Sequence, residues 1–336
     1  MSEIIVARDL PAFRAMRDDW NALYAAADAA PVSLGAVWLE AAWRLRWGGD
    51  FPRPFAVMLY ESGAPVVAGV FRFGWRGLRP TLYLVDSSLP QSGDLLYRSG
   101  TTIAQITELL AAVRRLAPLH RTLMLSACPD DSLLLATARS FPKPIVQRGE
   151  LPGARIHLSE HSGYDAWLAS LSSQFRGNFR RSLRALERLP DFAHVRETGA
   201  SARAAMNWLL DRKAGWLDDR DEASNWIHSG QARSMLTLLL EMETGSPVRI
   251  ETLRTGKRII AAAISFAEGR RRRLFMTAFD PDFARHSPGM VLLLLRIETA
   301  FAEGFSEVDL GRGTMQWKDR LTPHRYALVR GRVTLP

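Results

Sequence analysis

The chain has 336 residues, of which 47% are hydrophobic, so it is long enough for two domains with buried cores. Its one cysteine, Cys128, excludes an internal disulfide and a cysteine-based metal cluster, which fits a reducing, cytoplasmic compartment. The net charge of +9 favours acidic partners such as phosphates, nucleotides, nucleic acid or anionic lipid. Residues 1–10 lack a basic segment followed by an apolar run, and the apolar helix near 290–302 contains Arg296 and Glu298, so we expect neither a signal peptide nor a membrane span.

The first half of the chain reads as helices, then a meander of strands, then a strand–helix–strand passage. Apolar residues at helical spacing predict helices at 10–27, 38–45, 101–116 and 132–139. Apolar runs of strand length predict strands at 4–7, 55–60, 66–73, 81–85 and 122–126. The segment 61–64, Glu-Ser-Gly-Ala, separates two of these strands and indicates a hairpin.

Proline and glycine residues punctuate the middle of the chain at 141–144 and 149–153, so we expect a domain boundary near 145–160. The order of helices, meander and strand–helix–strand recurs after residue 160, which predicts a tandem pseudo-repeat with domains 1–150 and 151–336. The helix opening at 99–101 in the first half carries no basic pair. We therefore expect the first domain to be structural and the second to carry the chemistry.

The helix predicted at 172–189 carries one acid, Glu187, and five arginines that recur at intervals of mostly four: Arg176, Arg180, Arg181, Arg184 and Arg188. A solvated face is one interpretation. Contact with an anionic substrate is the second, because guanidinium groups bind oxyanions in a bidentate fashion. A clamp formed with acids of the first half is the third.

The next elements are two helices, at 202–216 and 225–242, and a hairpin. The hairpin strands at 248–253 and 259–266 are joined by Arg-Thr-Gly-Lys, with glycine at the turn. The run of four arginines at 270–273 is expected at the following turn, either solvated or in contact with nucleic acid.

A strand, a helix and a second strand are predicted between 271 and 318. The strand at 274–279 is apolar and aromatic, the helix at 290–303 is closed by Gly304, and the strand at 306–310 is stopped by glycines at 311 and 313. Such a βαβ unit has parallel strands and a right-handed crossover.

The helix of this unit begins with Ser287 as N-cap and Pro288 at its first position. A helix N-terminus offers free N–H groups and a partial positive charge, and Gly289 lets a ligand approach the backbone. With Arg285 and His286 just ahead, this opening predicts a phosphate or pyrophosphate site. An ordinary helix opening is the alternative.

Three motifs resemble the GNAT acyltransferase superfamily: Arg-His-Ser-Pro-Gly at 285–289, Asp-Leu-Gly-Arg-Gly at 309–313, and Trp317-Lys318. The pattern is most similar to the CelD-like branch, which is associated with bacterial polysaccharide synthesis and related to Fem-type peptidyltransferases. The helix motif Phe-Arg-x-Asn-x-Arg-Arg at 175–181 is typical of this branch. The resemblance covers about residues 160–325. It implies an α/β fold of tandem GNAT-like domains, each a mixed, mostly antiparallel sheet with a βαβ unit and flanking helices.

The resemblance also implies transfer of an acyl group from acyl-CoA, acetyl-CoA or longer, to an amine. The pantetheine would lie between the two parallel strands and the pyrophosphate at the helix start, which gives the donor-binding residues Met276, Thr277, Ala278, Arg285, His286, Ser287, Gly289 and Met290. Asp309 would be the base or an amine anchor, with capping of the glycine turn as the alternative, and Lys318 would pair with Asp309 or contact phosphate. The implied acceptor is an anionic sugar, polysaccharide or lipid-linked precursor, bound by Arg176, Asn178, Arg180 and Arg181.

Two other functions stay open: a Fem-like transferase that uses aminoacyl-tRNA, suggested by the basic charge, and a non-catalytic binding protein of polysaccharide synthesis. Hydrolase, ATPase and dehydrogenase functions are not expected, because no Gly-x-Ser-x-Gly, Walker or dinucleotide motif is found. No metal is expected either, because these histidines lack metal-ligand spacing: His157, His161, His194, His228 and His324.

Overall fold

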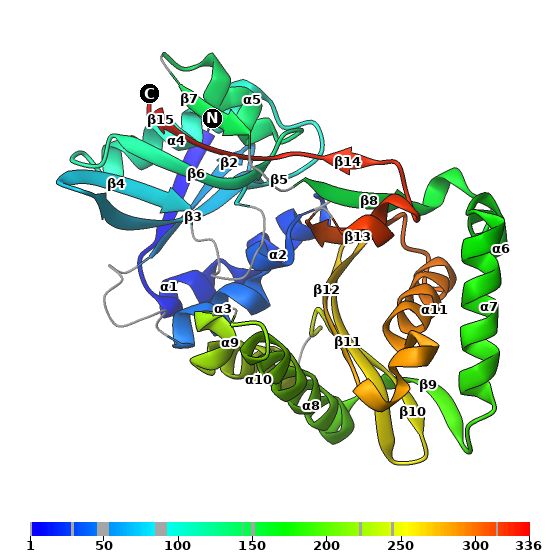
Figure 1. The fold of residues 1–336 in the computed structure, drawn as a ribbon. Helices are drawn as coiled ribbons and strands as arrows, with labels where there is room; N and C mark the ends of the chain where they lie inside the picture. Colours follow the sequence, from blue (N-terminus) through cyan, green and yellow to red (C-terminus); the bar gives the residue numbers. More distant parts are fainter. Residues whose placement is uncertain are drawn as a thin grey trace. The chain divides into compact units, whose positions relative to one another are not determined.

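The structure is a computed structural model, and it describes residues 2–27, 30–45, 54–84, 93–142, 144–148, 152–221, 224–242, 245–313 and 315–336 (Figure 1). The chain divides into two compact units. Unit 1 comprises Met1–Gly153 and Arg325–Pro336, and unit 2 comprises Ala154–His324.

The helices of unit 1 are α1 (Leu10–Ala15), α2 (Arg17–Ala25), η1 (Val32–Leu34), α3 (Ala36–Leu45), α4 (Ile103–Leu116) and α5 (Leu133–Ser140). Its strands are β1 (Ser2–Ala7), β2 (Phe55–Glu61), β3 (Ala64–Arg76), β4 (Arg79–Leu84), β5 (Leu96–Tyr97), β6 (Thr122–Pro129), β7 (Ile145–Arg148) and β15 (Leu328–Thr334). They form one sheet in the order β1-β2-β3-β4-β6-β15-β7, with β5 paired to β3.

Local sequence explains the shape of several elements in unit 1. The predicted hairpin turn is confirmed at Ser62 and Gly63, whose φ angles of 52° and 80° give the left-handed backbone that such a tight turn needs. The predicted helix at 10–27 is interrupted, since α1 ends at Ala15, Met16 has a non-helical ψ of 10°, and α2 begins with Arg17. The last predicted strand residue of 81–85 lies outside the described residues.

Helix α4 connects two parallel strands, β4 and β6, which pair from Thr81 with Thr122 to Tyr83 with Met124. Its start is closed by a capping box in which the Thr102 side chain accepts the Gln105 N–H and the Gln105 side chain accepts the Thr102 N–H. Unit 1 therefore contains a complete βαβ passage.

The helices of unit 2 are η2 (Leu158–Glu160), α6 (Tyr164–Ser170), α7 (Ser173–Glu187), α8 (Gly199–Asp218), α9 (Asn225–His228), α10 (Gln231–Glu241), η3 (Pro281–His286), α11 (Pro288–Ala302) and α12 (Gln316–Asp319). Its strands are β8 (Gly153–His157), β9 (Phe192–Glu197), β10 (Val248–Thr255), β11 (Arg258–Glu268), β12 (Arg271–Phe279) and β13 (Glu307–Arg312). The sheet order is β8-β13-β12-β11-β10-β9. The short strand β14 (Arg325–Tyr326) precedes β15 in unit 1.

The sheet of unit 2 is covered on both faces (Figure 1). Helix α11 packs on β10, β11 and β12 and is itself covered by α6 and α7. Helices α8 and α10 lie on the other face. Leucine and isoleucine side chains of α11 fill the space over the strands, and Leu292, Leu294 and Ile297 are fully buried. The apolar character of this helix is thus explained by burial on two sides.

Both sheets are mixed and mostly antiparallel, each contains a parallel pair bridged by a helix, and helices flank both. This confirms the predicted α/β fold class, in which each of two domains has a mixed, mostly antiparallel sheet with a βαβ unit and flanking helices. The predicted boundary between residues 150 and 151 lies close to the division at Gly153. Residues Arg325–Pro336, which were predicted in the second domain, belong to unit 1. They pack with unit 1 because β15 pairs with β6 and β7. Among the described residues, no helix is long and apolar enough to cross a membrane.

The prediction of a solvated turn at 270–273 holds for Arg270, which is exposed in the turn, but is wrong for the other three arginines. Arg271, Arg272 and Arg273 belong to β12 and are only 9%, 1% and 6% exposed. Each of them forms an ion pair with an acid on another strand, which removes the penalty that burial of an unpaired charge would carry. The strand predicted at 306–310 also continues through Gly311 to Arg312.

Candidate active site

Strands β12 and β13 pair only over the first part of β12. The parallel ladder joins Arg271 to Glu307, Arg272 to Val308 and Arg273 to Asp309. On its other edge β12 stays paired with β11 as far as Phe279, after a bulge opposite Ile264 and Ser265. In an antiparallel ladder only alternate residues turn their N–H groups toward the partner strand. Residues 274–279 therefore direct some N–H groups toward the side on which the pairing with β13 has ended.

The first turn of α11 lies against this part of β12. A Cβ added to Gly289 would be 3.5 Å from Cδ1 of Phe279 and 3.8 Å from Cγ2 of Thr277, which are ordinary contact distances. Thr277 and Phe279 lie two residues apart on one face of β12, and both are exposed. The structure thus brings together the predicted donor-binding residues of the strand with those of the helix start.

The backbone before α11 has an unusual conformation. Ser287 occupies the N-cap position as predicted, but its φ of 47° and ψ of 50° are left-handed, and its side chain caps no N–H group. Arg285 and His286 end the 3₁₀ helix η3, where the Arg285 Nε donates to Nε2 of His286 at 3.0 Å. The N–H of Gly289 has no hydrogen-bond acceptor within the described part of the chain. A left-handed non-glycine residue costs free energy and is common at binding sites.

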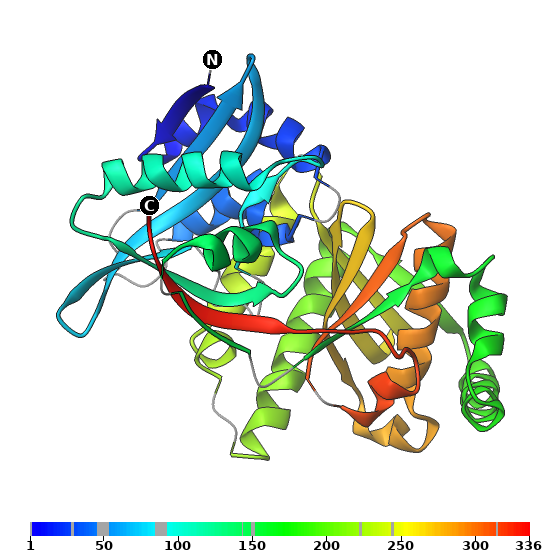
Figure 2. The ribbon, with the colours of Figure 1, turned by 90° about the horizontal axis from the view of Figure 1, so that it is seen from above.

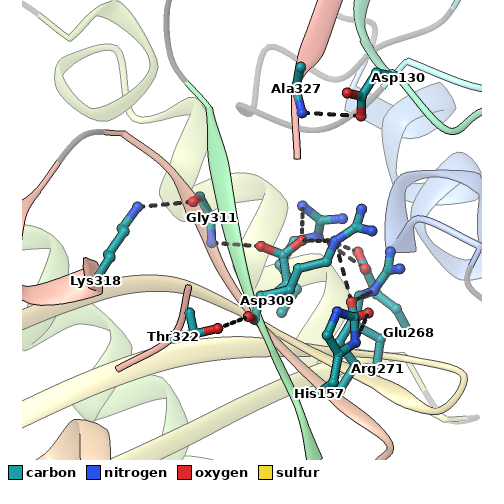
Figure 3. A network of polar contacts seen from close by, with 12 residues as sticks. Asp130, His157, Glu268, Arg271, Asp309, Gly311, Lys318, Thr322 and Ala327 are labelled. Carbon is teal, nitrogen blue, oxygen red and sulfur yellow. Dashed lines mark hydrogen bonds and ion pairs between the residues drawn. The ribbon is translucent and has the colours of Figure 1, made fainter. Parts of the chain in front are cut away.

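Asp309 and Lys318 hold the same turn from two sides (Figure 3). The Asp309 Oδ1 accepts the N–H of Gly311 at 2.7 Å, and the Lys318 Nζ donates to the carbonyl oxygens of Gly311 at 2.9 Å and Arg312 at 2.6 Å. Gly311 has a φ of 73°, and its position is close to the Leu274 carbonyl. These contacts favour the turn-capping alternative for Asp309.

The environment of Asp309 keeps its carboxylate ionised. Burial alone would raise the pKa of this fully buried group, but Arg273, Arg271 and the Gly311 N–H together hold the pKa of Asp309 below its ordinary value. The Arg273 Nη1 lies 3.2 Å from Asp309 Oδ2. A buried carboxylate with a lowered pKa is a poor acceptor of a proton from an amine. Lys318 is only 3% exposed, which likewise indicates a supporting role.

Asp309 belongs to a ladder of charges that crosses four strands. Arg271 and Arg273 on β12 pair with Glu307 and Asp309, which lie directly opposite on β13. On the flanking strands, Arg155 Nε of β8 lies 3.5 Å from Glu307, and Glu268 of β11 accepts Arg273 Nε at 2.9 Å. Directly opposed charges of opposite sign stabilise a sheet and fix its register.

A second buried network lies between the sheet and α11. Glu251 of β10 forms ion pairs with Arg272 of β12 and, at 3.3 Å, with Arg296 of α11. The Arg296 Nη2 donates to the Ile264 carbonyl, and Arg272 donates to the Arg296 carbonyl. Burial would raise the pKa of Glu251, but contacts with His194 and with the two guanidinium groups lower it to about 2. This network attaches α11, and therefore the Gly289 end of the helix, to three strands.

The arginines of α7 do not share one role. Arg176 donates to the carbonyl oxygens of Ala169 and Leu171, so it joins α6 to α7. Four others and Asn178 are exposed, and none of the four forms an ion pair with a described acid of residues 154–324: Arg180, Arg181, Arg184 and Arg188. Phe175, Phe179 and Leu186 bury the opposite face of α7. Helix α7 contacts both α11 and η3.

The sequence did not indicate a cluster formed by His157, Glu160 and His324. The His324 Nε2 lies 3.1 Å from Glu160, and the rings of His157 and His324 meet edge to face at 4.6 Å. His157 Nδ1 is also 3.5 Å from Glu307. The three side chains could offer ligand atoms within 4.8 Å of one another. A sequence separation of 164 residues between Glu160 and His324 hides this group from any spacing argument.

The region that contains these elements also matches a known protein family. Residues 173–319 match the family model described as "Acetyltransferase (GNAT) domain". The chain contains a GNAT-type acetyltransferase domain. The matched region includes α7, β12, α11, β13 and α12, so it covers every predicted site residue. No curated protein matches the sequence of the chain.

Several solved structures share the fold over nearly the whole chain. FemX has a TM-score of 0.67 at 9% identity, over 94% of this chain and 95% of that one. A conserved protein of unknown function from Bacteroides thetaiotaomicron has a TM-score of 0.59 at 14% identity, over 99% and 100%. The C-terminal domain of a putative lysylphosphatidylglycerol synthetase from Agrobacterium fabrum has a TM-score of 0.56 at 12% identity, over 95% and 91%. At these identities the similarity concerns the fold.

Proposed function

We propose that this chain is an acyl-CoA-dependent N-acyltransferase, and that residues of unit 2 bind both substrates. The observation that carries the proposal is the place where β12 ends its pairing with β13, because the open first turn of α11 lies against this place within the region matching the GNAT domain. A helix start with a free N–H and no side chain at Gly289 suits a pyrophosphate. A Cβ atom at position 289 would lie at ordinary contact distances from the protein's own atoms, so packing does not require a glycine here. A ligand that approaches the backbone explains the glycine better.

The proposed reaction needs three actions from the chain. Arg285, His286 and the first turn of α11 hold the donor phosphates, and backbone N–H groups of 276–278 bind the thioester oxygen as it becomes negative. The amine nitrogen forms the amide bond and the thioester C–S bond breaks. The amine proton passes through water to the leaving thiolate, which departs as the free thiol. We place Asp309 and Lys318 behind the site as positioning residues, which fix the Gly311 turn beside Leu274.

The exposed arginines of α7 are the proposed acceptor-binding surface. Arg180, Arg181 and Asn178 present two guanidinium groups and an amide to solvent, and α7 contacts η3. Such groups suit an anionic acceptor, such as an amino sugar on a nucleotide, polysaccharide or lipid carrier. We infer on the same ground that the chain is of the CelD-like kind. Arg176 supports α7 through backbone contacts rather than through the acceptor.

The proposal is tested by native mass spectrometry of the purified chain with and without added acetyl-CoA. We expect one acyl-CoA per chain, and release of the free thiol when an anionic amine acceptor is added. A control in which Gly215, on the open surface of α8, is changed to valine is expected to retain the adduct. Failure of acetyl-CoA and of longer acyl-CoAs to bind would remove the donor assignment.

A Fem-like transferase using aminoacyl-tRNA is the second candidate, favoured by the fold similarity to FemX and by the net charge of +9. It predicts tRNA binding that weakens steeply as salt rises, because phosphate contacts release counterions. Filter binding of tRNA at two salt concentrations distinguishes aminoacyl-tRNA from acyl-CoA as the donor. A non-catalytic binding protein would bind acyl-CoA no more tightly than inorganic phosphate.

A further inference from the structure

The tip of the β3–β4 hairpin in unit 1 exposes large apolar side chains. Trp75 is 66% exposed and Leu78 is 95% exposed. Leu119, in the loop between α4 and β6, is 76% exposed. The loop lies beside the hairpin, because the ring of His120 is 4.8 Å from that of Phe73 and 6.5 Å from that of Trp75. Figure 2 shows the hairpin extending beyond the other strands of its sheet.

The charged residues of the hairpin and of the neighbouring loop are all basic. The hairpin carries Arg76 and Arg79, and Arg121 follows the loop; all three are exposed. The sequence contains no aspartate or glutamate at 62–85 or at 109–129, which covers the hairpin and the loop. None of the three arginines forms an ion pair with any residue that the structure describes. We call Trp75, Arg76, Leu78, Arg79, Leu119 and Arg121 the hairpin patch.

We propose that the hairpin patch docks the protein on membranes that contain anionic lipid. Trp75, Leu78 and Leu119 enter the interfacial region of the bilayer, and the three arginines contact the lipid phosphates. Tryptophan is favoured at the headgroup level, and each basic residue near an anionic surface adds to the attraction. Docking of this kind is peripheral, and it does not depend on the acyl transfer proposed above.

The shape and chemistry of the patch favour a membrane over other partners. Leu78 stands at the end of a convex hairpin, and an aliphatic tip gains free energy by entering an apolar medium. Nucleic acid would bind the arginines through its phosphates and could stack on Trp75, but it provides no apolar contact for Leu78 and Leu119. A protein partner would need a recess that matches the tip, whereas a bilayer needs none. The absence of acids from the hairpin and the loop fits binding to a negatively charged surface.

Co-sedimentation of the full chain with vesicles tests the proposal. We expect binding to vesicles of phosphatidylcholine with phosphatidylglycerol, and little binding to phosphatidylcholine alone. The anionic binding should weaken as salt rises but not vanish, because the apolar contacts are not screened. Equal binding to both vesicle types, or no binding to the anionic ones, would overturn the proposal.

Two variants with matched controls separate the contributions. Arg76→Ala with Arg79→Ala, and Trp75→Ala with Leu78→Ala, should each weaken anionic vesicle binding by roughly tenfold or more. The controls are Arg180→Ala with Arg181→Ala on α7 and Trp216→Ala on α8, where Trp216 is 40% exposed. Full binding by both hairpin variants, or loss of binding in the α7 variant alone, would contradict the docking site. Melting temperatures confirm folding, since all four hairpin side chains are exposed.

A fluorescent probe tests insertion of the tip directly. In a Leu78→Cys variant the probe reacts at position 78, because the natural Cys128 is fully buried. Emission should shift to the blue with anionic vesicles and stay unchanged with a short tRNA-sized RNA. A probe at Ile103→Cys, 44% exposed at the start of α4, should not shift. A shift at position 78 caused by RNA but not by vesicles would show that the hairpin patch binds nucleic acid and not a membrane.

Discussion

Glu251 is 1% exposed and lies between two guanidinium groups, those of Arg272 and Arg296. The pKa of Arg296 is lowered by burial to about 10, so the side chain is still protonated at neutral pH and the ion pair is charged. Buried ion pairs contribute little compared with an apolar core, but removal of one partner leaves a buried charge without compensation. The cost of breaking this network should therefore be large.

We predict that Glu251→Gln lowers the free energy of unfolding by about 3 kcal/mol. A matched control is Glu241→Gln, because Glu241 pairs with Arg203 on the surface, where the side chains are 43% and 51% exposed. That change should cost less than about 1 kcal/mol. Urea unfolding at pH 7 gives both values. Equal small losses would show that Arg272 and Arg296 are solvated in solution.

The same carboxylate makes stability depend on pH. The pKa of Glu251 is lowered from 4.5 to about 2 in the folded chain, so its stabilisation is complete above pH 4.5 and is lost as the pH falls toward 2. The shift corresponds to about 3 kcal/mol. We predict that the drop in unfolding free energy between pH 5 and pH 3 is smaller in Glu251→Gln than in the natural chain. Identical pH curves would contradict this assignment.

Asp309 offers a prediction that separates a base from a positioning residue. Asp309→Asn should lower kcat and thermal stability, yet leave the acidic limb of the rate profile against pH in place. If Asp309 were the base, that limb would disappear. Lys318→Met should act through the same Gly311 turn, so the double variant should be less impaired than the two single effects added together. Additive effects would show that the two residues act independently, which would contradict their shared role at the Gly311 turn.

At the residue scale the sequence singled out Gly289, Asp309 and Lys318 as site residues. The structure places Gly289 against the end of β12, and Asp309 and Lys318 at the Gly311 turn. The burial of Arg271–Arg273 was missed, because their acidic partners are recognised only once the strand register is known. From sequence alone, a run of charged residues is predicted to be exposed, because the oppositely charged partners that would allow its burial are not known.

Helix α7 carries the acceptor prediction at the scale of one element. Arg180→Ala with Arg181→Ala should raise the acceptor KM several-fold and leave acyl-CoA affinity and melting temperature nearly unchanged, because both side chains are exposed. Arg176→Ala should instead lower the melting temperature, since it loses contacts with the Ala169 and Leu171 carbonyls. Steady-state kinetics and thermal melts measure both. A large loss of stability in the double variant would support the clamp interpretation.

Elements with strong local signals were predicted closely. The capped helix α7, helix α11 and the β10–β11 hairpin with its glycine turn lie where start signals and apolar periodicity predict them. The break at Met16 was missed, because it comes from backbone conformation rather than from a proline or glycine. The left-handed Ser287 was also missed, since Ser-Pro-Gly is typical of an ordinary helix start.

At the scale of the whole molecule, the two units repeat a βαβ passage but differ at the helix start. The N-terminus of α4 is closed by the Thr102–Gln105 capping box, whereas the side chain of Ser287 leaves the start of α11 open. We propose accordingly that unit 1 is structural and that unit 2 binds the donor. The order of elements predicted this repeat, but the pairing of β15 in unit 1 required long-range contacts that no local pattern shows.

Thr102→Ala tests the division between the units. Loss of the cap should reduce the free energy of unfolding by about 1 kcal/mol and leave acetyl-CoA affinity unchanged. Ser132→Ala, which removes the cap of α5 in the same unit, is a matched variant with the same expected binding. Differential scanning calorimetry and a binding titration give the two readouts. Weakened donor binding in Thr102→Ala would place a ligand at unit 1.

Calorimetric titration with acetyl-CoA tests most directly the claim that the opening of α11 binds the donor. We predict that Gly289→Val abolishes measurable binding and that Arg285→Ala weakens it by roughly 1.5–3 kcal/mol, while Gly215→Val, a glycine with open space on α8, binds as the natural chain does. All three should melt near the natural temperature. Unchanged acetyl-CoA affinity in both Gly289→Val and Arg285→Ala would contradict the account.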